Sequence, residues 1–571
     1  MSLLLKWAAA KLEGIVPLPE DNIYALLELP PRPELGDAAF PCFTLARPLA
    51  KPPARIAAEL AERLNGAGGE GIRAEAAGPY LNLFFEPACW GPKLMEAALD
   101  PAFGTSDRRA GERVVIDLSS PNIAKPFGVG HLRSTMIGSA LARLYRASGY
   151  DVVTVNHIGD WGTQFGKLLE AYLRWGDEEA LKRDPIRESL KLYVRFHEEA
   201  ERDPQLEEEG RRRFWMLENG DPEALRLWRF FVTFSMEEFE RVYARLGVTF
   251  DHTLGESFYN GKMDAVVRRL AELGLLEESD GAQVVRLDDK AMPPCLIVKS
   301  DGTTIYGLRD LATALYRRRE MGADRLLYVV GAEQSLHFSQ VFEVLRRMGE
   351  PWAEQCRHIA FGLMKLEGRK MSTRRGQVVY LDDVLDEAVR RAEAIIAEKN
   401  PSLRERRETA EAVGIGAVVF GDLKNGRMLE VDFSLDEALR FEGETGPYVQ
   451  YAAARAYRLL DASGLAPESS FVPAAARHDG PSLTAPSAWD LLKALGAYPE
   501  AVAEAVRLNE PSVLARYLLD AAKRFNRFYH QERIMTSDAE ETAAKLRLAA
   551  ACAGVLESGL GMLGIRAPRQ I

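Results

Sequence analysis

The chain has 571 residues, of which 47% are hydrophobic and 27% are charged, and this composition predicts several folded domains rather than one core or a disordered chain. The net charge of −11 argues against a protein that coats nucleic acid through its overall charge, although a local basic face can still bind RNA. The five cysteines form no CxxC pair and the eight histidines no HExxH motif, so we expect no disulfide framework, no protein-held metal and a cytoplasmic location.

The first hundred residues mix two kinds of periodicity. PPARIAAELAERL (52–64) has the spacing of an amphipathic helix, and GPYLNLFFEP (78–87) has the alternation of a strand. We therefore predict a small α+β domain over residues 1–107. Lys6 and Lys11 interrupt the first apolar run, and no longer apolar run follows, so no membrane helix is expected.

Strands that alternate with helices begin at Arg113. The apolar runs VVIDLSS, DVVTVNHIG and RLLYVVGAEQ are each followed by a helical pattern, which predicts a parallel, doubly wound α/β sheet. We place this domain at residues 108–385, with an inserted, largely helical region at about 177–290. Residues 386–571 are almost wholly helical in pattern and form a third domain.

A glycine-rich turn follows the first of these predicted strands, in PNIAKPFGVGHLRST (121–135). At such a place the next helix presents unpaired N–H groups and a positive dipole end to phosphates. Gly128 and Gly130 allow close approach of the backbone, while Lys125 and His131 add charge or donors. The spacing matches neither GxxxxGK[ST] nor GxGxxG, so on the residues alone a packing turn and a phosphate site are both open.

A second segment carries cations among small hydroxyl residues. LEGRKMSTRRGQVV (366–379) places Lys370, Arg374 and Arg375 between two apolar runs, which suits a phosphate clamp. Here GVGH resembles the HIGH signature of class I aminoacyl-tRNA synthetases, and KMSTR resembles their KMSKS signature. The two signatures in this order are far more specific than either one alone.

The resemblance is closest to arginyl-tRNA synthetases and covers essentially the whole chain. It rests on the segments SSPNIAKPF, NHIGDWGTQFG, SDGTTIYGLRD, VVGAEQSLHF, FEGETGPYVQYAAAR and FNRFYHQ. It implies a Rossmann-like doubly wound catalytic domain between an N-terminal α+β domain that binds tRNA and an all-α C-terminal anticodon-binding bundle.

The reaction that the resemblance implies is that of an arginine-tRNA ligase. Arginine and ATP form arginyl-adenylate, and the arginyl group then passes to the terminal adenosine of tRNA(Arg), with Mg²⁺ carried by ATP. Since charge builds on the transferring phosphate, preorganised donors are needed. The residues implied for catalysis are Lys125, His131, Lys370, Ser372 and Arg374. Those implied for ATP binding are Gly128, Gly130, His131, His157 and Met371.

Arginine recognition has its own requirement, because a planar guanidinium is best met by carboxylates. The family pattern implies Glu256 and Asp310 for this group and Tyr306 for the pocket wall. The residues implied for the α-amino and carboxylate end are Asn122, Asn156 and Gln334. On the residues alone, Asp310 could equally cap the following helix and Glu256 could be an exposed turn residue.

The tRNA contacts are expected at both ends of the chain. Tyr448 and Arg455 are candidates in the helical domain, whereas Phe525 and Phe528 have the spacing of core residues. The resemblance implies that the N-terminal domain holds a flipped base, and Tyr80 and Asn82, two apart on one strand, would share a face there.

The chain departs from the family pattern at two places. Gly128 occupies the first position of the first signature, where histidine is usual, and Thr373 occupies the fourth position of the second, where lysine is usual. Two alternatives therefore remain: a catalytically weakened, synthetase-like tRNA-binding protein, and a class I relative with a small-molecule acceptor. The family also implies that arginine activation requires tRNA, and we expect a monomer.

Overall fold

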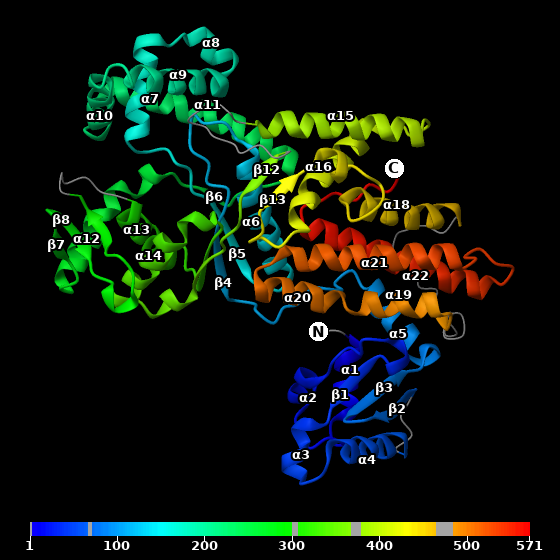
Figure 1. The fold of residues 1–571 in the computed structure, drawn as a ribbon. Helices are drawn as coiled ribbons and strands as arrows, with labels where there is room; N and C mark the ends of the chain where they lie inside the picture. Colours follow the sequence, from blue (N-terminus) through cyan, green and yellow to red (C-terminus); the bar gives the residue numbers. More distant parts are fainter. Residues whose placement is uncertain (1–2, 67–70, 300–305, 367–378, 464–482) are drawn as a thin grey trace.

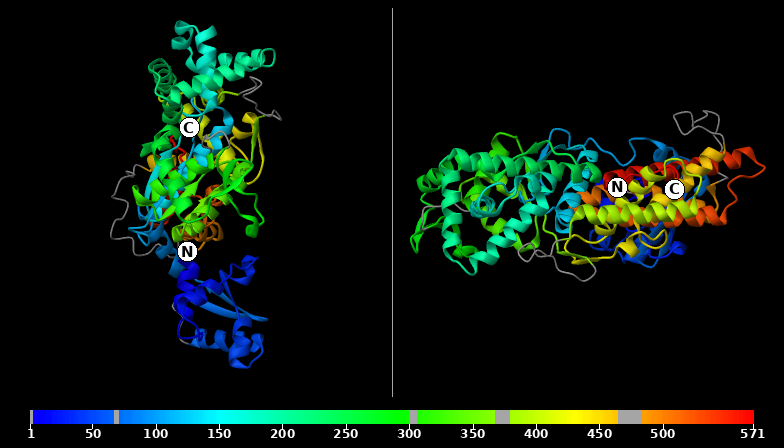
Figure 2. Two further views of the ribbon diagram at one scale, coloured as in Figure 1. Left: turned by 90° about the vertical axis from the view of Figure 1, so that its left-hand side faces the viewer. Right: turned by 90° about the horizontal axis from the view of Figure 1, so that it is seen from above.

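The computed structural model describes residues 3–66, 71–299, 306–366, 379–463 and 483–571. The N-terminal domain stands at one end of an elongated molecule, and a group of helices inserted in the central domain stands at the other (Figures 1 and 2). The central sheet and the C-terminal helices lie side by side between them. No helix within these described ranges is both long and apolar enough to span a membrane.

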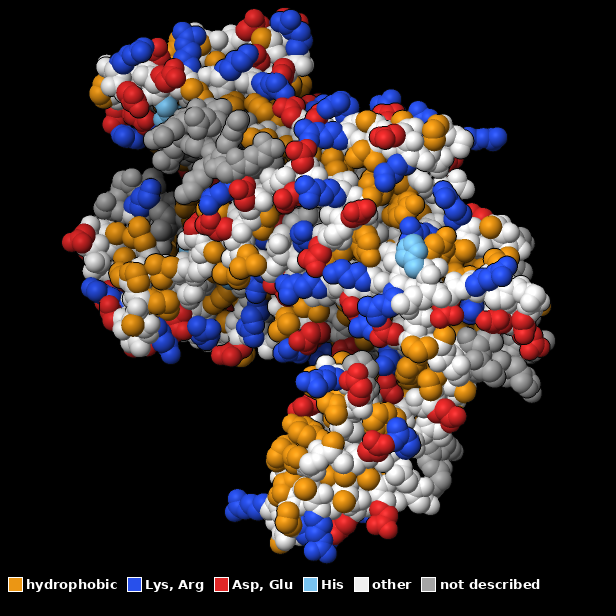
Figure 3. All heavy atoms as spheres, turned by 45° about the vertical axis from the view of Figure 1, so that its right-hand side comes forward, with side chains coloured by type: hydrophobic (Ala, Val, Ile, Leu, Met, Phe, Trp, Pro, Cys, Tyr) orange, Lys and Arg blue, Asp and Glu red, His pale blue; other side chains and the backbone are white. Residues whose placement is uncertain are grey.

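The N-terminal domain is a three-stranded antiparallel sheet, in the order β1-β3-β2, with helices around it. In β3, Leu81, Leu83 and Phe85 face the core, which explains the alternation in the sequence. Exposed apolar side chains gather on this domain (Figure 3), including Phe43. The elements are α1 (Leu3–Leu12), α2 (Glu20–Leu26), β1 (Ala38–Pro41), α3 (Phe43–Leu49), α4 (Pro53–Gly66), β2 (Ile72–Ala77), β3 (Tyr80–Phe85) and α5 (Pro87–Leu99).

The central sheet is parallel throughout, in the order β11-β10-β4-β5-β6. The predicted doubly wound architecture is thereby confirmed. Its elements are β4 (Arg113–Asp117), α6 (Val129–Ala147), β5 (Asp151–Asn156), β6 (His252–Thr253), α12 (Met263–Glu272), α13 (Tyr306–Arg319), β10 (Arg325–Tyr328), α14 (Ser335–Arg347), β11 (Cys356–His358) and β12 (Met364–Leu366).

Two additions interrupt this central domain. The first is helical, and its helices end at Leu246, after which the chain returns to the central sheet at β6. The second is a small antiparallel sheet, β7-β8-β9, for which the sequence offered only short apolar runs. The elements of the two additions are α7 (Thr163–Trp175), α8 (Glu178–Arg183), α9 (Pro185–Ala200), α10 (Gln205–Glu218), α11 (Pro222–Leu246), β7 (Glu277–Ser279), β8 (Ala282–Val285) and β9 (Cys295–Val298).

The C-terminal third is a helical bundle, as predicted. Phe525 and Phe528 are fully buried in it, so their assignment to the core is confirmed. Among the residues described in this domain, β13 is the one strand, and it pairs with β12 of the central domain. The elements are α15 (Leu381–Lys399), α16 (Arg406–Leu423), β13 (Val431–Phe433), α17 (Leu435–Ala438), α18 (Gly446–Ala462), α19 (Pro486–Gly496), α20 (Tyr498–Leu508), α21 (Pro511–Gln531) and α22 (Ala539–Met562).

Candidate active site

A cavity of about 870 Å³ opens at the carboxyl ends of the central strands. Asp117, His157 and Tyr328 line it from the ends of β4, β5 and β10, and Gly130 and His131 line it from the first turn of α6. A smaller cavity of about 280 Å³ adjoins it, because Asn122, Gly159, Glu256 and Tyr306 line both. Ligands of doubly wound sheets bind at this edge.

The segment between β4 and α6 is tightly folded. Ser119, Ser120 and Ala124 have φ angles of 69°, 52° and 57°, in the left-handed region that side chains other than glycine rarely adopt. The amide oxygen of Asn156 accepts a hydrogen bond from the N–H of Ser120 at 3.2 Å, and the hydroxyl of Ser235 accepts one from the N–H of Ala124 at 2.8 Å. Strained backbone of this kind is found at functional sites, where the surrounding structure imposes it.

Asn156 departs from the sequence prediction. It is fully buried and does not line either cavity. Its amide nitrogen donates to the hydroxyl of Tyr243 at 3.2 Å, while its oxygen holds Ser120. The side chain thus shapes the segment, and its assignment to the α-amino and carboxylate end of arginine stays a prediction. Asn122 does reach the cavities, and a Cβ at Gly159 would lie 2.1 Å from its amide oxygen, so a side chain at position 159 would displace the Asn122 amide.

The first turn of α6 presents donors to the cavity. Gly128 precedes the helix with φ −87°, and its N–H donates to Nδ1 of His131 at 3.2 Å. Because Nδ1 accepts, the neutral ring carries its proton on Nε2, which is left as a donor. Burial lowers the pKa of His131 to about 4, and Lys125 adds to the decrease. His131 is therefore a neutral donor at pH 7.

The chain that follows the second signature approaches the first signature at this turn. The N–H of Val129 donates to the carbonyl of Val379 at 3.3 Å, and Gly128 forms a bridge with Tyr380. On the other side, Met364 and Lys365 line the cavity. Lys370, Met371, Ser372 and Arg374 lie outside the described residues, but the chain on both sides of them reaches the site.

Glu256 begins a short 3₁₀ helix, Glu256–Lys262, and its carboxylate faces the cavity. Nη1 of Arg309 lies 3.1 Å from it, and the two side chains are only 14% and 9% exposed for Glu256 and Arg309. Burial raises the pKa of Glu256 to about 7, although Arg309 opposes this and Asp310 and Asp160 add to it. Glu256 is not an exposed turn residue.

Asp310 lies in the second turn of α13, so it does not cap that helix. Its Oδ2 lies 2.5 Å from Nε2 of His337. His337 lies in the first turn of α14 and lines the cavity. Tyr306, the first residue of α13, is 65% exposed and lines both cavities, and Gln334 lines the larger one. The two carboxylates and these polar side chains thus converge on one space.

His157 and Lys125 lie at the two ends of this arrangement. Burial lowers the pKa of His157, and its Nδ1 is buried with no hydrogen-bond partner among the described residues. Lys125 lines the smaller cavity, with its ammonium 5.4 Å from the ring centre of Tyr193. Both predicted residues therefore reach the site, but they lie in different parts of it.

Arg133, in the second turn of α6, was not singled out by the sequence. Its Nε lies 2.9 Å from Oδ1 of Asp422 on α16, and both side chains are buried, at 1% and 0% exposure. Its Nη1 also donates to the carbonyls of Gly362 and Leu429. Burial raises the pKa of Asp422 to about 6, although Arg133 opposes this. Only the tertiary fold brings these partners together.

The predicted tRNA-contacting residues occupy two separate surfaces. Tyr80 is half-buried, and its ring meets that of Phe43 edge-on at 5.5 Å, whereas Asn82 is only 5% exposed. In the bundle, the guanidinium of Arg455 lies between the rings of Tyr451 and Tyr529, at 4.9 and 4.8 Å. Tyr448 lies one turn before Tyr451 on α18 and is half-buried.

Comparison with known protein families matches three consecutive models to the chain. Residues 4–85 match the arginyl tRNA synthetase N terminal domain, residues 97–435 the catalytic domain of tRNA synthetases class I (R), and residues 449–571 the DALR anticodon binding domain.

Curated relatives match over nearly the full length. The chain is 48% identical over 97% of both chains to arginine–tRNA ligase 1 of Bacillus cereus, and 47% identical over 98% of both chains to arginine–tRNA ligase of Clostridium perfringens. Among solved structures, the Thermus thermophilus arginyl-tRNA synthetase is 30% identical with a TM-score of 0.82 over all of both chains. The Plasmodium falciparum arginyl-tRNA synthetase, at 20% identity and a TM-score of 0.79, shares the fold.

The parallel sheet, the donor-lined turn at its carboxyl edge and the matching catalytic model define a class I aminoacyl-tRNA synthetase. In the sequence, the match to the catalytic domain lies between the matches to the N-terminal domain and to the anticodon binding domain. Within that class, the chain belongs to the arginyl-tRNA synthetase family and is an arginine–tRNA ligase.

Proposed function

We propose that the cavity at the carboxyl edge of the sheet binds L-arginine and ATP with its Mg²⁺, forms arginyl-adenylate, and transfers arginine to the terminal adenosine of tRNA(Arg). The observation that carries this proposal is that Glu256, Asp310 and the first turn of α6 line the same cavity. Carboxylates suit a guanidinium, and the helix N-terminus suits phosphates.

The guanidinium is bound by the two carboxylates, with Tyr306 at the cavity wall. Both carboxylates already face a basic side chain of the protein, Arg309 and His337. Arginine therefore joins an existing set of charged contacts, and does not enter an empty acidic pocket. Asn122 and Gln334 are placed for the α-amino and carboxylate end, and Asn156 acts by holding Ser120 in place.

ATP lies along the first turn of α6. Nothing lies within 4 Å of a Cβ built on Gly130, so a phosphate or ribose can approach the backbone there. His131 donates from Nε2, and Gly128, His157 and Lys125 complete the described part of the nucleotide site. Lys370, Met371, Ser372 and Arg374 are proposed to contact the nucleotide from the second signature.

In the first step, a carboxylate oxygen of arginine attacks the α-phosphorus and the bond to pyrophosphate breaks. Mg²⁺ bound to ATP neutralises charge on the departing pyrophosphate. In the second step, a ribose hydroxyl of the terminal adenosine attacks the arginyl carbonyl, the bond from the carbonyl carbon to the phosphate oxygen breaks, AMP departs, and the hydroxyl proton passes to the departing phosphate or to solvent. No side chain forms a covalent bond, so catalysis rests on positioning and on the donors described above.

The remaining assignments are proposals of the same kind. The domains are taken as residues 1–107, 108–385 and 386–571, with tRNA contacts at Tyr80 and Asn82 in the first and at Tyr448 and Arg455 in the last. The five cysteines are all free thiols, which fits a reducing cytoplasm. A monomer is expected, and sedimentation equilibrium measures it.

Aminoacylation of tRNA(Arg) with each of the amino acids, with and without ATP, tests the function. Arginine alone should be attached, and only with ATP. Transfer of arginine to a small acceptor, or tRNA binding without charging, would overturn the proposal. Exchange of pyrophosphate into ATP should be negligible until tRNA is added.

A further inference from the structure

A second cleft, of about 660 Å³, lies where the N-terminal, central and helical domains meet. We call it the junction cleft. Its walls come from α1, from the connecting segment 104–109, from the ends of α6 and β10, and from α20. It is separate from the active-site cavity, because the residues that line the two cavities do not overlap.

The charge of the junction cleft has one sign. Among the described residues that line it there is no Asp or Glu, but there are six cations. They are Lys6, Arg108, Arg109, Arg325, Arg357 and Arg507. In a protein with a net charge of −11, six cations around one hollow make a strong local positive field.

Carboxylates just outside the cleft neutralise only part of this charge. Glu112 pairs with Arg109 at 2.8 Å and with Arg325 at 3.5 Å, and Glu504 pairs with Arg507. Within the described part of the chain, Lys6, Arg108 and Arg357 have no carboxylate within ion-pair distance. Arg357 donates to the backbone carbonyls of Glu354 and Cys356, which leaves its charge unbalanced.

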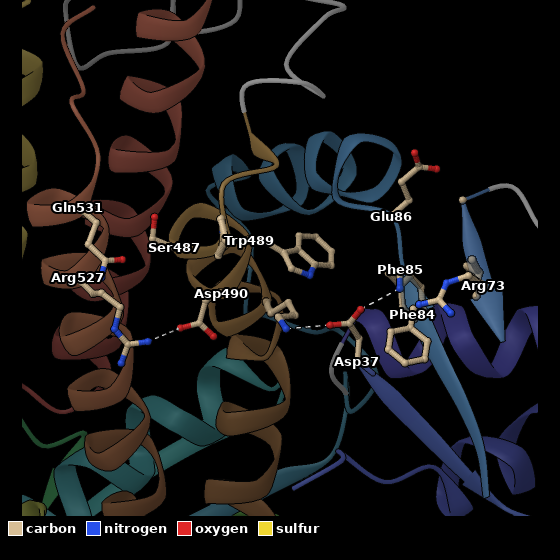
Figure 4. A pocket seen from close by; sticks show the side chains of 14 residues that line it. Asp37, Arg73, Phe84, Phe85, Glu86, Ser487, Trp489, Asp490, Arg527 and Gln531 are labelled. Carbon is tan, nitrogen blue, oxygen red and sulfur yellow. Dashed lines mark hydrogen bonds and ion pairs between the residues drawn. The ribbon is translucent and has the colours of Figure 1, made fainter. Parts of the chain in front are cut away.

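The larger cavity between the N-terminal domain and the helical bundle differs in this respect (Figure 4). There Lys493 pairs with Asp37 at 2.8 Å, and Arg527 pairs with Asp490 at 3.2 Å. Basic and acidic side chains alternate around that cavity and cancel each other. An excess of positive charge is therefore a property of the junction cleft and not of every gap between the domains.

We propose that the junction cleft binds backbone phosphates of the bound tRNA. Guanidinium groups pair with phosphate oxygens, and such contacts position an RNA without reading its bases. The cleft adjoins both the N-terminal domain and the helical domain, to which the tRNA contacts are assigned, so a tRNA held by both domains would lie beside it. The inference rests on the proposed tRNA-charging function, and it adds a phosphate-binding site to the two surfaces already predicted.

The test compares three double variants by direct binding of tRNA(Arg) over a range of salt concentrations. Arg108→Ala/Arg357→Ala removes two unbalanced charges, and Arg108→Lys/Arg357→Lys keeps them. Arg268→Ala/Arg269→Ala, on the exposed face of α12 far from the junction, is the matched control. Thermal melting establishes that each variant is folded.

The alanine variant should bind tRNA about tenfold more weakly. The slope of its log affinity against log salt concentration should fall by the equivalent of about two phosphate contacts. The lysine variant and the α12 variant should bind like the parent. The kcat of the alanine variant for charging at saturating tRNA should be unchanged, which separates this proposal from the active-site assignments. Unchanged affinity and salt dependence in a folded alanine variant would overturn the proposal. Binding of tripolyphosphate is measured on the same variants. If the alanine variant loses tripolyphosphate binding but binds tRNA unaltered, the proposal is also overturned, in favour of a site for free polyphosphate.

Discussion

Nε2 of His337 lies 2.5 Å from Oδ2 of Asp310, at the place where the guanidinium of arginine is proposed to bind. The contact orients the carboxylate through one oxygen and leaves the other for the substrate. His337 is therefore a positioning residue in the proposed site.

Replacing Asp310 by Asn should raise the Michaelis constant for arginine by roughly 100-fold, because a charge-assisted contact to a buried guanidinium contributes about 1.5–3 kcal/mol. His337→Ala should raise it by less, with kcat nearly unchanged, and His337→Asn should restore part of the loss. Steady-state charging kinetics measure both constants. Asp264→Asn on α12 is the control, and an equal effect there would refute the assignment.

The pKa of Glu256, raised to about 7, predicts a pH dependence of arginine affinity. Below pH 7 the carboxyl is protonated and loses its attraction for the guanidinium, which stays charged. The Michaelis constant for arginine should therefore rise roughly tenfold between pH 8 and pH 6. His131, with a pKa of about 4, does not titrate in this range.

Glu256→Gln should remove this pH dependence and raise the Michaelis constant at every pH. A variant that keeps the same pH profile would show that another group titrates. Because binding and protonation are linked, bound arginine should in turn lower the pKa of Glu256, which a backbone or side-chain NMR titration detects.

The buried pair of Arg133 and Asp422 predicts a large loss of stability when one partner is removed. Asp422→Ala leaves an arginine buried without its counterion, which costs about 3–5 kcal/mol. Melting temperature should fall markedly, and charging activity with it. The double variant Arg133→Met/Asp422→Leu should melt higher than Asp422→Ala, and a strictly additive result would exclude direct coupling between the two.

Gly128→His tests whether a donor is missing from the first signature. Gly128 has φ −87°, which a side chain accepts without backbone strain, but it is buried, so thermal melting must first establish that the variant is folded. An added donor at the transferring phosphate should raise the rate of adenylate formation about tenfold. Rapid-quench measurement in the presence of tRNA gives this rate, and no gain means that other donors already supply the contact.

Asn82→Ala should weaken charging by raising the Michaelis constant for tRNA while leaving ATP binding alone. Asn82 is only 5% exposed, so its contribution to tRNA binding should be smaller than that of Tyr80. The ring of Tyr80 packs edge-on against the ring of the exposed Phe43. Filter binding of tRNA and fluorescence titration of ATP separate the two effects. Unaltered charging by both Asn82→Ala and Tyr80→Ala would remove the N-terminal sheet from the RNA-binding surface.

Sequence patterns predicted β4, β5 and β10 because these strands are mostly buried and each is followed by a long helix, whereas the short edge strands β6 and β11 carry no such apolar run. The helical pattern expected after DVVTVNHIG is found as α7 (Thr163–Trp175). The small β7-β8-β9 sheet was not predicted, because its strands are short and only partly buried and therefore show no clear alternation in the sequence.

The site was predictable where a motif fixes a side chain locally, as at Gly130, His131 and Asp310. It was not predictable where partners come from distant elements. The burial of Asn156 under Ser120, the pairing of Glu256 with Arg309 and the contact between α6 and α16 all depend on the tertiary fold.

The ion pair between Arg133 and Asp422 has a further consequence for communication across the molecule. Asp422 lies on α16, which packs against α18, the helix that carries Tyr448 and Arg455. Arg133 lies on α6, one turn from the donors that face the nucleotide. Packed helices and one buried ion pair therefore connect the helix that carries the proposed tRNA contacts with the turn that is proposed to hold the nucleotide.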